Sequence, residues 1–258
     1  MPATAIDRNY LESLLRDCKL DHTLTGFGSE PAETRWLVPT GITELDARLD
    51  GGIPRGHLSE VVGPRSSGRL AILASALAGA TMRGEAVALI DPLDMFDPVS
   101  ASASGIDFER MLWVRGEASS SARVSVSCEY GTLQKSLDRA VKALNIVFQA
   151  GPHARQPRVG PEAGGFGLVV IDLGEVATQS IRRLPYTTWL RLHRVIEGSE
   201  TACVLIASEP IARSSGGVTI QLASGSRLQA PGLNARVIRA RKVESDQYVR
   251  VPLSAAAC

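Results

Sequence analysis

The chain alternates short apolar runs with longer segments in which apolar residues recur every three or four positions. Short apolar runs are typical of buried strands, and recurrence at three and four positions is typical of one face of a helix. Strands are therefore predicted at "LSEVVG", "AVALID", "MLWV", "LVVID" and "TACVLIAS", with half-exposed strands at "ARVIRARKV" and "QYVRVPL". Helices are predicted at residues 69–84, 130–150 and 185–198. Because strands and helices alternate, we expect an α/β fold with a mainly parallel sheet and helices on both faces.

A further helix is predicted near the start of the chain, where residues 9–20 place apolar side chains at helical spacing. A polar, glycine-containing segment follows it. We therefore expect an N-terminal helical arm and linker over residues 1–37 and the α/β domain over residues 38–258. An arm of this kind more often folds back on its own domain than binds a partner, and both readings stay open. The Gly/Pro-rich residues 150–167 are predicted to be a flexible loop.

Composition adds little about partners. The 258 residues are 44% hydrophobic and 21% charged, with a formal net charge of +1, so any binding surface for nucleic acid must be local. Charged residues interrupt the first thirty positions, and no apolar run is long enough to span a bilayer. The four cysteines have neither metal-site nor redox-pair spacing. We expect a soluble, cytoplasmic protein without a structural metal and without membrane association.

The stretch "GPRSSGRL", residues 63–70, has the glycine frame of a loop that cradles phosphate between a strand and a helix. Arg69 stands where such a loop has lysine, and its planar guanidinium is not equivalent to an ammonium group there. Leu70 replaces the hydroxyl residue that would hold magnesium. Hydrolysis is therefore not expected, and no cofactor is required, although weak ATP, ADP or anion binding is compatible with the backbone. The candidate binding residues of this vestigial loop are Gly63, Pro64, Ser66, Ser67, Gly68 and Arg69.

The segment "TGITELDARLDGGIPRGHLSEVVGPRSSGRL" resembles the start of the RecA recombinase core, and "ALIDPLDMFDP" and "LVVID" resemble two later RecA strands. The resemblance covers about residues 38–210 and implies a RecA-like core. Leu93 stands where RecA has its water-activating glutamate, and Ser208 where it has the glutamine that senses the terminal phosphate. With lysine and threonine also replaced, by Arg69 and Leu70, the resemblance implies a pseudo-ATPase.

Two aspartates near this site have alternative readings. Asp172 matches the magnesium-side aspartate of RecA, but it is more simply a strand-end residue that caps the turn at Gly174. Asp94 can supply a carboxylate if the alignment shifts by one position, but it is more simply a capping or solvent-facing residue.

The two intervals that correspond to the DNA-binding loops of RecA are short in this chain. Arg182, Arg183 and Arg213 are candidate contacts to the phosphates of single-stranded DNA. No aromatic stacking partners accompany them, so solvated surface arginines are an equally good reading.

The leading helix, the arginine-substituted loop and the chain length together resemble the ImuA family of RecA-like accessory factors. That resemblance implies a role in DNA-damage-induced translesion synthesis (SOS mutagenesis) through contacts with the polymerase-like protein ImuB and with RecA, and indirectly with an error-prone DNA polymerase. It implies association with the nucleoid after damage. Two alternatives remain: a slow DNA-stimulated ATPase that uses Arg69 and Asp94, and a cell-division inhibitor of the SulA type.

Overall fold

The computed structural model of the chain describes residues 36–116, 130–149, 165–212, 216–223, 233–240 and 249–251. All of them belong to one compact unit, Thr34–Cys258. The predicted helix at residues 9–20, most of the predicted loop at residues 150–167, and Arg213 lie outside the described residues. Those predictions therefore stay predictions.

Among the described residues, an eight-stranded sheet has the order β10-β9-β8-β3-β7-β6-β4-β5. The strands from β8 to β5 run parallel, and β9 and β10 are antiparallel to their neighbours. A separate antiparallel pair joins β1 to β2. The strands are β1 (Leu37–Val38), β2 (Ile53–Pro54), β3 (Leu58–Val62), β4 (Ala86–Asp91), β5 (Met111–Arg115), β6 (Phe166–Asp172), β7 (Ala202–Ala207), β8 (Thr219–Ala223), β9 (Leu233–Arg239) and β10 (Val249–Val251).

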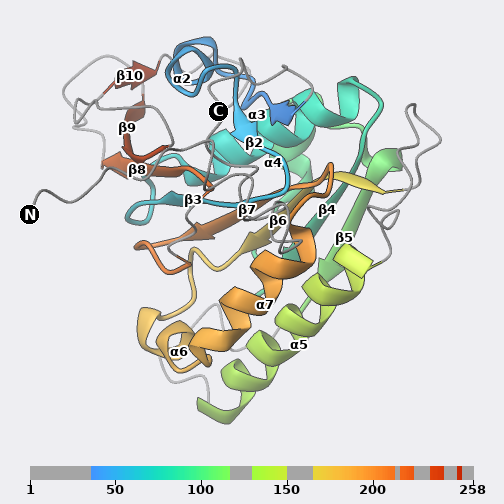
Figure 1. The fold of residues 1–258 in the computed structure, drawn as a ribbon, viewed down its shortest axis with the longest axis vertical. Helices are drawn as coiled ribbons and strands as arrows, with labels where there is room; N and C mark the ends of the chain where they lie inside the picture. The colour runs from blue at the N-terminus through green and yellow to red at the C-terminus, as the bar shows by residue number, and fades with distance from the viewer. Residues whose placement is uncertain are drawn as a thin grey trace, which may run out of the picture. The chain divides into compact units, whose positions relative to one another are not determined.

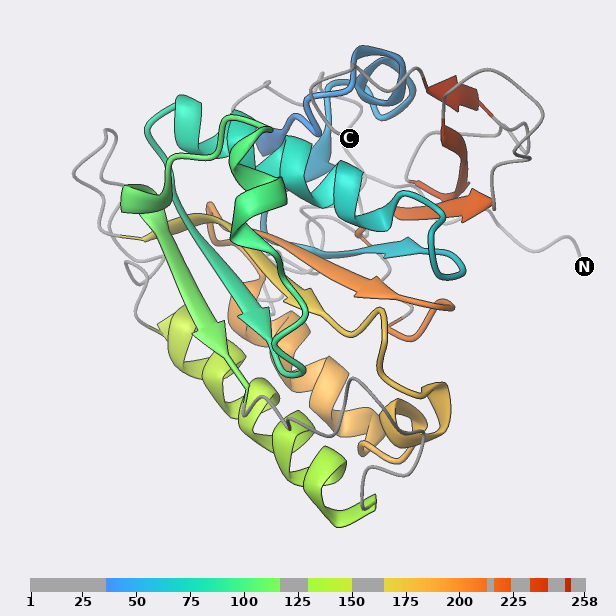
Figure 2. The same cartoon turned by 180° about the vertical axis from the view of Figure 1, so that it is seen from behind.

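Helices cover both faces of this sheet, as Figures 1 and 2 show from opposite sides. Helices α2 to α4 share one buried apolar cluster with the sheet, and α5 to α7 share the other. Each cluster buries the apolar stripe of its helices against the sheet, which is the main source of the stability of such a domain. The helices are α2 (Thr43–Arg48), α3 (Arg69–Met82), α4 (Pro98–Ser102), α5 (Tyr130–Gln149), α6 (Thr178–Arg182) and α7 (Tyr186–Ile196), with a short 3-10 helix, η3 (Phe108–Arg110).

The α/β architecture predicted from the apolar pattern is confirmed, and every predicted strand and helix within the described residues is present. Two details differ. The sequence did not single out strand β8, which lies inside the sheet between β9 and β3. Strand β6 begins at Phe166 rather than after residue 167, because Phe166 is half-buried against the α5–α7 cluster and pairs with Ala86 of β4.

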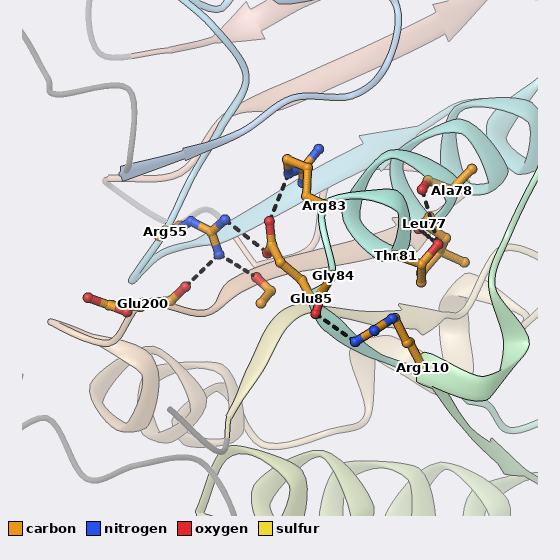
Figure 3. A network of polar contacts seen from close by, with 10 residues as sticks. Arg55, Leu77, Ala78, Thr81, Arg83, Gly84, Glu85, Arg110 and Glu200 are labelled. Carbon is orange, nitrogen blue, oxygen red and sulfur yellow. Dashed lines mark hydrogen bonds and ion pairs between the residues drawn. The ribbon is translucent and has the colours of Figure 1, made fainter. Parts of the chain in front are cut away.

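A network of hydrogen bonds and ion pairs connects the N-terminal ends of neighbouring strands (Figure 3). Arg55, in the turn before β3, donates to the carbonyl oxygens of Gly167 at 3.0 Å and Glu200 at 2.8 Å. Its second amino group bonds Glu85 at 2.9 Å, and Glu85 also accepts from Arg83 at 2.8 Å. Arg55 thus fixes the starts of β4, β6 and β7 relative to β3.

The described helices include none with the length and apolar character that a membrane span requires.

Candidate functional site

The candidate site lies at the edge of the sheet where the parallel strands end. β3 and β7 pair up to Val62 and Ala207, and β6 ends at Asp172 opposite Ile206 of β7. Since the carboxyl ends of parallel strands meet at one edge, the loops that follow them are brought together there, which is where open α/β sheets bind ligands. The phosphate-type loop follows β3 at this edge.

The loop has the tight backbone that its glycines predicted. A Cβ atom on Gly63 would lie 2.7 Å from the carbonyl oxygen of Leu222 in β8, so only glycine fits between the loop and that strand. Gly68 has a φ of 92° and directly precedes α3, whose first turn begins as Ala71 N–H and Ile72 N–H donate to its carbonyl oxygen. The loop therefore leads directly into the N-terminus of a fourteen-residue helix.

Arg69 points its guanidinium into the protein. Its side chain is 6% exposed, donates to the carbonyl oxygen of Gly174 at 2.9 Å, and forms an ion pair with Glu175 at 2.9 Å. A side chain on Gly174 would bring a Cβ atom to 3.0 Å from the guanidinium carbon, so glycine at that position leaves room for the arginine. Leu70, in contrast, is 53% exposed and has no oxygen with which to ligate a metal.

Glu175, in the loop after β6, is the residue of this site that the sequence did not reveal. Its carboxylate meets Arg69 and, at 3.6 Å, the exposed Arg65 of the phosphate-type loop. Both arginines of the loop thus face the same partly exposed carboxylate. No local sequence pattern predicts this contact, because Arg69 and Glu175 are 106 residues apart.

Asp172 caps the turn at Gly174, which confirms the simpler of its two readings. Its Oδ1 accepts a hydrogen bond of 2.9 Å from the Gly174 N–H. Burial raises the pKa of this carboxyl from 3.8 to about 6, against the lowering effects of the Gly174 N–H and of Arg69; nearby Asp91 raises it further. The arrangement engages Asp172 within the protein rather than presenting it to a metal.

Leu93 and Asp94, in the turn after β4, have different surroundings. Leu93 packs against the α5–α7 cluster. Asp94 was expected to be a cap or to face solvent, and the solvent-facing reading is wrong: its side chain is 10% exposed and forms a two-pronged ion pair with Arg115 at 2.7 and 2.8 Å. Asp91 is the residue that holds the turn, since its carboxylate accepts from the backbone N–H groups of Met95 and Phe96.

Side-chain contacts connect α6, which follows β6, with the segment after β7. The hydroxyl of Ser208 lies 3.0 Å from that of Thr178 at the start of α6. Arg182, a candidate DNA contact, forms an ion pair of 2.6 Å with Glu209 while its side chain stays 69% exposed. Arg183 is exposed beside it.

The residues present do not fit a magnesium nucleotide of the RecA type. Leu70 offers no ligand, Asp172 caps a turn, and Arg69 is committed to Gly174 and Glu175. Across the residues that the structure describes, His, Cys, Asp and Glu nowhere gather in a group of three or more that could hold a metal ion. The buried cation of the loop, Arg69, is paired within the protein, while Arg65 stays largely exposed.

Comparison with known proteins points to one family. The RecA N-terminal domain family matches residues 22–124. Protein RecA of Streptomyces avermitilis is 40% identical over 86 residues, which are 33% of this chain and 23% of that protein. Protein RecA of Prochlorococcus marinus is 42% identical over 74 residues, covering 29% and 20% of the two chains. Protein RecA of a Synechococcus species is 30% identical over 149 residues, covering 57% and 36%.

The alignments thus span between a fifth and about a third of the length of these relatives. The family match over residues 22–124 includes the phosphate-type loop and the first three parallel strands along the chain, β3 to β5. The sheet order and the two helical layers are those of an α/β domain in which such a loop follows a central strand. The described domain is a RecA-like core.

Proposed function

We propose that this chain is a non-catalytic, RecA-like accessory protein that acts by protein–protein contacts in DNA-damage-induced translesion synthesis. Its partners in this proposal are an ImuB-type polymerase-like protein and RecA, and through them an error-prone polymerase. The observation that carries the non-catalytic part is the burial of Arg69 against Gly174 and Glu175, which engages the cation at the lysine position of the loop within the protein.

The other replaced positions support the same proposal. The Leu70 side chain cannot hold magnesium, and Leu93 is an apolar side chain packed on the core where RecA would have a base. Ser208 is bonded to Thr178 within the protein, where a longer amide side chain would reach toward a terminal phosphate. These losses affect separate parts of the ATP cycle, so restoring one of them alone would not restore turnover.

A RecA-like core without phosphate chemistry suggests how such a protein acts. RecA assembles into filaments, and the resemblance implies that nucleotide lies between neighbouring subunits there. A chain that keeps the docking surface and lacks the chemistry can join a filament end and stop its growth. The accessory role then consists of limiting RecA filaments where translesion synthesis takes place.

An ATPase measurement tests the non-catalytic part. Phosphate release from ATP and magnesium is measured for the wild-type chain and for Arg69→Ala, each with and without single-stranded DNA. We expect both proteins to remain at background. Magnesium-dependent turnover by the wild type that Arg69→Ala abolishes would instead establish the chain as a slow DNA-stimulated ATPase.

A filament assay tests the RecA part. RecA filaments on single-stranded DNA are imaged with increasing amounts of the chain. We expect shortening at well below one chain per RecA subunit, because capping an end needs few molecules. Unchanged filament length at equimolar chain rules out the proposed capping.

A co-purification tests the ImuB part and the role of the predicted arm. Leu14→Asp places a charge on the apolar face of the helix predicted at residues 9–20, and Ser13→Asp places the same charge on the opposite face. If the arm docks on ImuB, Leu14→Asp loses the partner and Ser13→Asp retains it. Equal retention by both variants argues against the arm as the ImuB contact.

A further inference from the structure

The phosphate-type loop is held to the segment after β6 by a compact cluster of charges. This arginine–Glu175 cluster consists of Arg65, Arg69, Gly174 and Glu175. Arg69 Nη2 lies 2.9 Å from Glu175 Oε1, Arg65 Nε lies 3.6 Å from Glu175 Oε2, and Arg69 Nη1 donates to the Gly174 carbonyl oxygen at 2.9 Å. Each oxygen of one carboxylate thus meets a different arginine of the loop.

The cluster resembles an oxyanion-binding site in which the carboxylate of Glu175 takes the place of the oxyanion. Arginine forks bind carboxylates and phosphates by the same paired N–H···O geometry. Arg69 is 6% exposed and Glu175 is 32% exposed, so the ion pair is screened less than a surface pair. A phosphate approaching the loop would meet arginines that are already paired and a nearby negative charge.

The cluster is also connected to the neighbouring segments. Glu175 lies in the loop between β6 and α6. From α6, Thr178 bonds Ser208, and Arg182 pairs with Glu209. Glu175 is thus linked along the chain to α6, whose side chains contact the segment that follows β7.

We propose that Glu175 acts as an internal anion that keeps the loop at residues 63–69 closed to phosphate-type oxyanions and fixes α6 to the loop. The contact is autoinhibitory: an oxyanion binds only by displacing the carboxylate, and its displacement releases α6 from the loop. This inference does not depend on the proposed partners, since it concerns the loop and its own carboxylate, and it holds or fails whether or not the chain meets RecA or ImuB.

Anion titration of the full chain tests the first part. Inorganic pyrophosphate and ADP are titrated without metal, at constant ionic strength, into the wild type, Glu175→Gln and Glu197→Gln. Glu197 follows α7 and is exposed, so its variant makes the same charge change away from the loop. We expect Glu175→Gln to bind pyrophosphate about tenfold more tightly than the wild type, because one like charge within a few ångström is removed. Glu197→Gln should bind as the wild type does.

Two further variants make the result specific. Glu175→Asp keeps the charge but shortens the side chain, and it should give a smaller gain than Glu175→Gln. Adding Arg69→Ala to Glu175→Gln should remove most of the gain, since Arg69 is the closer and more buried of the two arginines that Glu175 meets. Equal affinities of the wild type and Glu175→Gln, or a gain that is undiminished by loss of Arg69, would overturn the inference. The ADP arm identifies the source of the phosphate: a gain equal to that for pyrophosphate assigns binding to the diphosphate group, and a larger gain assigns part of it to the nucleoside.

Hydrogen exchange tests the second part. Backbone amides of α6 should exchange faster in Glu175→Gln than in the wild type. Those of α7 should exchange at the same rate in these two proteins. Unchanged exchange in α6 would show that the carboxylate does not fix that helix. This readout also shows whether each variant remains folded.

Discussion

Glu60, in the centre of β3, offers a quantitative test of how the fold holds the segment after β7. Its side chain is 1% exposed. Its Oε1 accepts backbone hydrogen bonds from Ile211 at 2.6 Å and Ala212 at 2.7 Å, and its Oε2 lies 3.4 Å from the Thr219 hydroxyl. A carboxylate buried in a central strand thus anchors residues 211–212 to the sheet.

Two substitutions at this position separate the charge from the geometry. In Glu60→Ala both N–H groups lose a charged acceptor, and at roughly 1.5–3 kcal/mol for each such bond the free energy of unfolding should fall by about 3–6 kcal/mol. In Glu60→Gln the amide oxygen still accepts from both N–H groups, so the loss should be about 1–3 kcal/mol. For a domain of this size, a loss of about 4 kcal/mol lowers the melting temperature by roughly 8–16 °C.

Urea unfolding of the wild type and both variants measures these losses, with Glu197→Ala as an exposed glutamate control. Hydrogen exchange at Ile211 and Ala212 reports whether the loss is local. If Glu60→Ala stays within 1 kcal/mol of the wild type, the carboxylate does not hold this segment and the reasoning fails.

Three further predictions follow from other contacts. Arg55→Met should lower the free energy of unfolding by about 2–3 kcal/mol, since it leaves Glu85 and two carbonyl oxygens short of a donor; a urea midpoint equal to that of the wild type would contradict it. Because the pKa of Asp172 is raised from 3.8 to about 6 on folding, its folded carboxyl holds a proton that the unfolded chain has released, so the contribution of Asp172 to stability should fall as pH rises from about 4 to 6. Asp172→Asn should lack this slope and be more stable at pH 7, by at most roughly 3 kcal/mol, in denaturation across pH; parallel pH profiles would refute this. Gly63→Ala should cost about 1–3 kcal/mol in thermal unfolding, because its Cβ would lie 2.7 Å from the Leu222 carbonyl oxygen; an unchanged melting temperature would mean that the loop shifts freely.

Much of the fold follows from local patterns. The run at residues 58–62 and the helical spacing at residues 69–82 predicted β3 and α3 with their glycine loop between them. In α5 two of the apolar residues that recur at helical spacing, Leu137 and Leu144, are 1% and 0% exposed. These features could be predicted because the period of a strand or helix and the backbone demands of a tight turn are properties of neighbouring residues.

The reading of individual polar residues succeeded only where their partners are close in the sequence. Asp172 was read as a cap for Gly174, two residues away, and this is confirmed. Asp94 was misread because its partner, Arg115, comes from the next strand of the sheet, 21 residues later. The position of Asp94 depends on β4 and β5 lying side by side, which no local pattern specifies.

The sequence by itself determined that this chain forms an α/β domain with a phosphate-type loop, and that the loop lacks the lysine and hydroxyl residues of RecA. Only the tertiary structure decided what Arg69 does, because its partner Glu175 is 106 residues away. The same holds for Glu60, whose backbone partners lie 151 and 152 residues further along. The physical reason is that parallel strands bring the ends of distant segments to one edge of the sheet, and the charges that meet there depend on strand order rather than on sequence spacing.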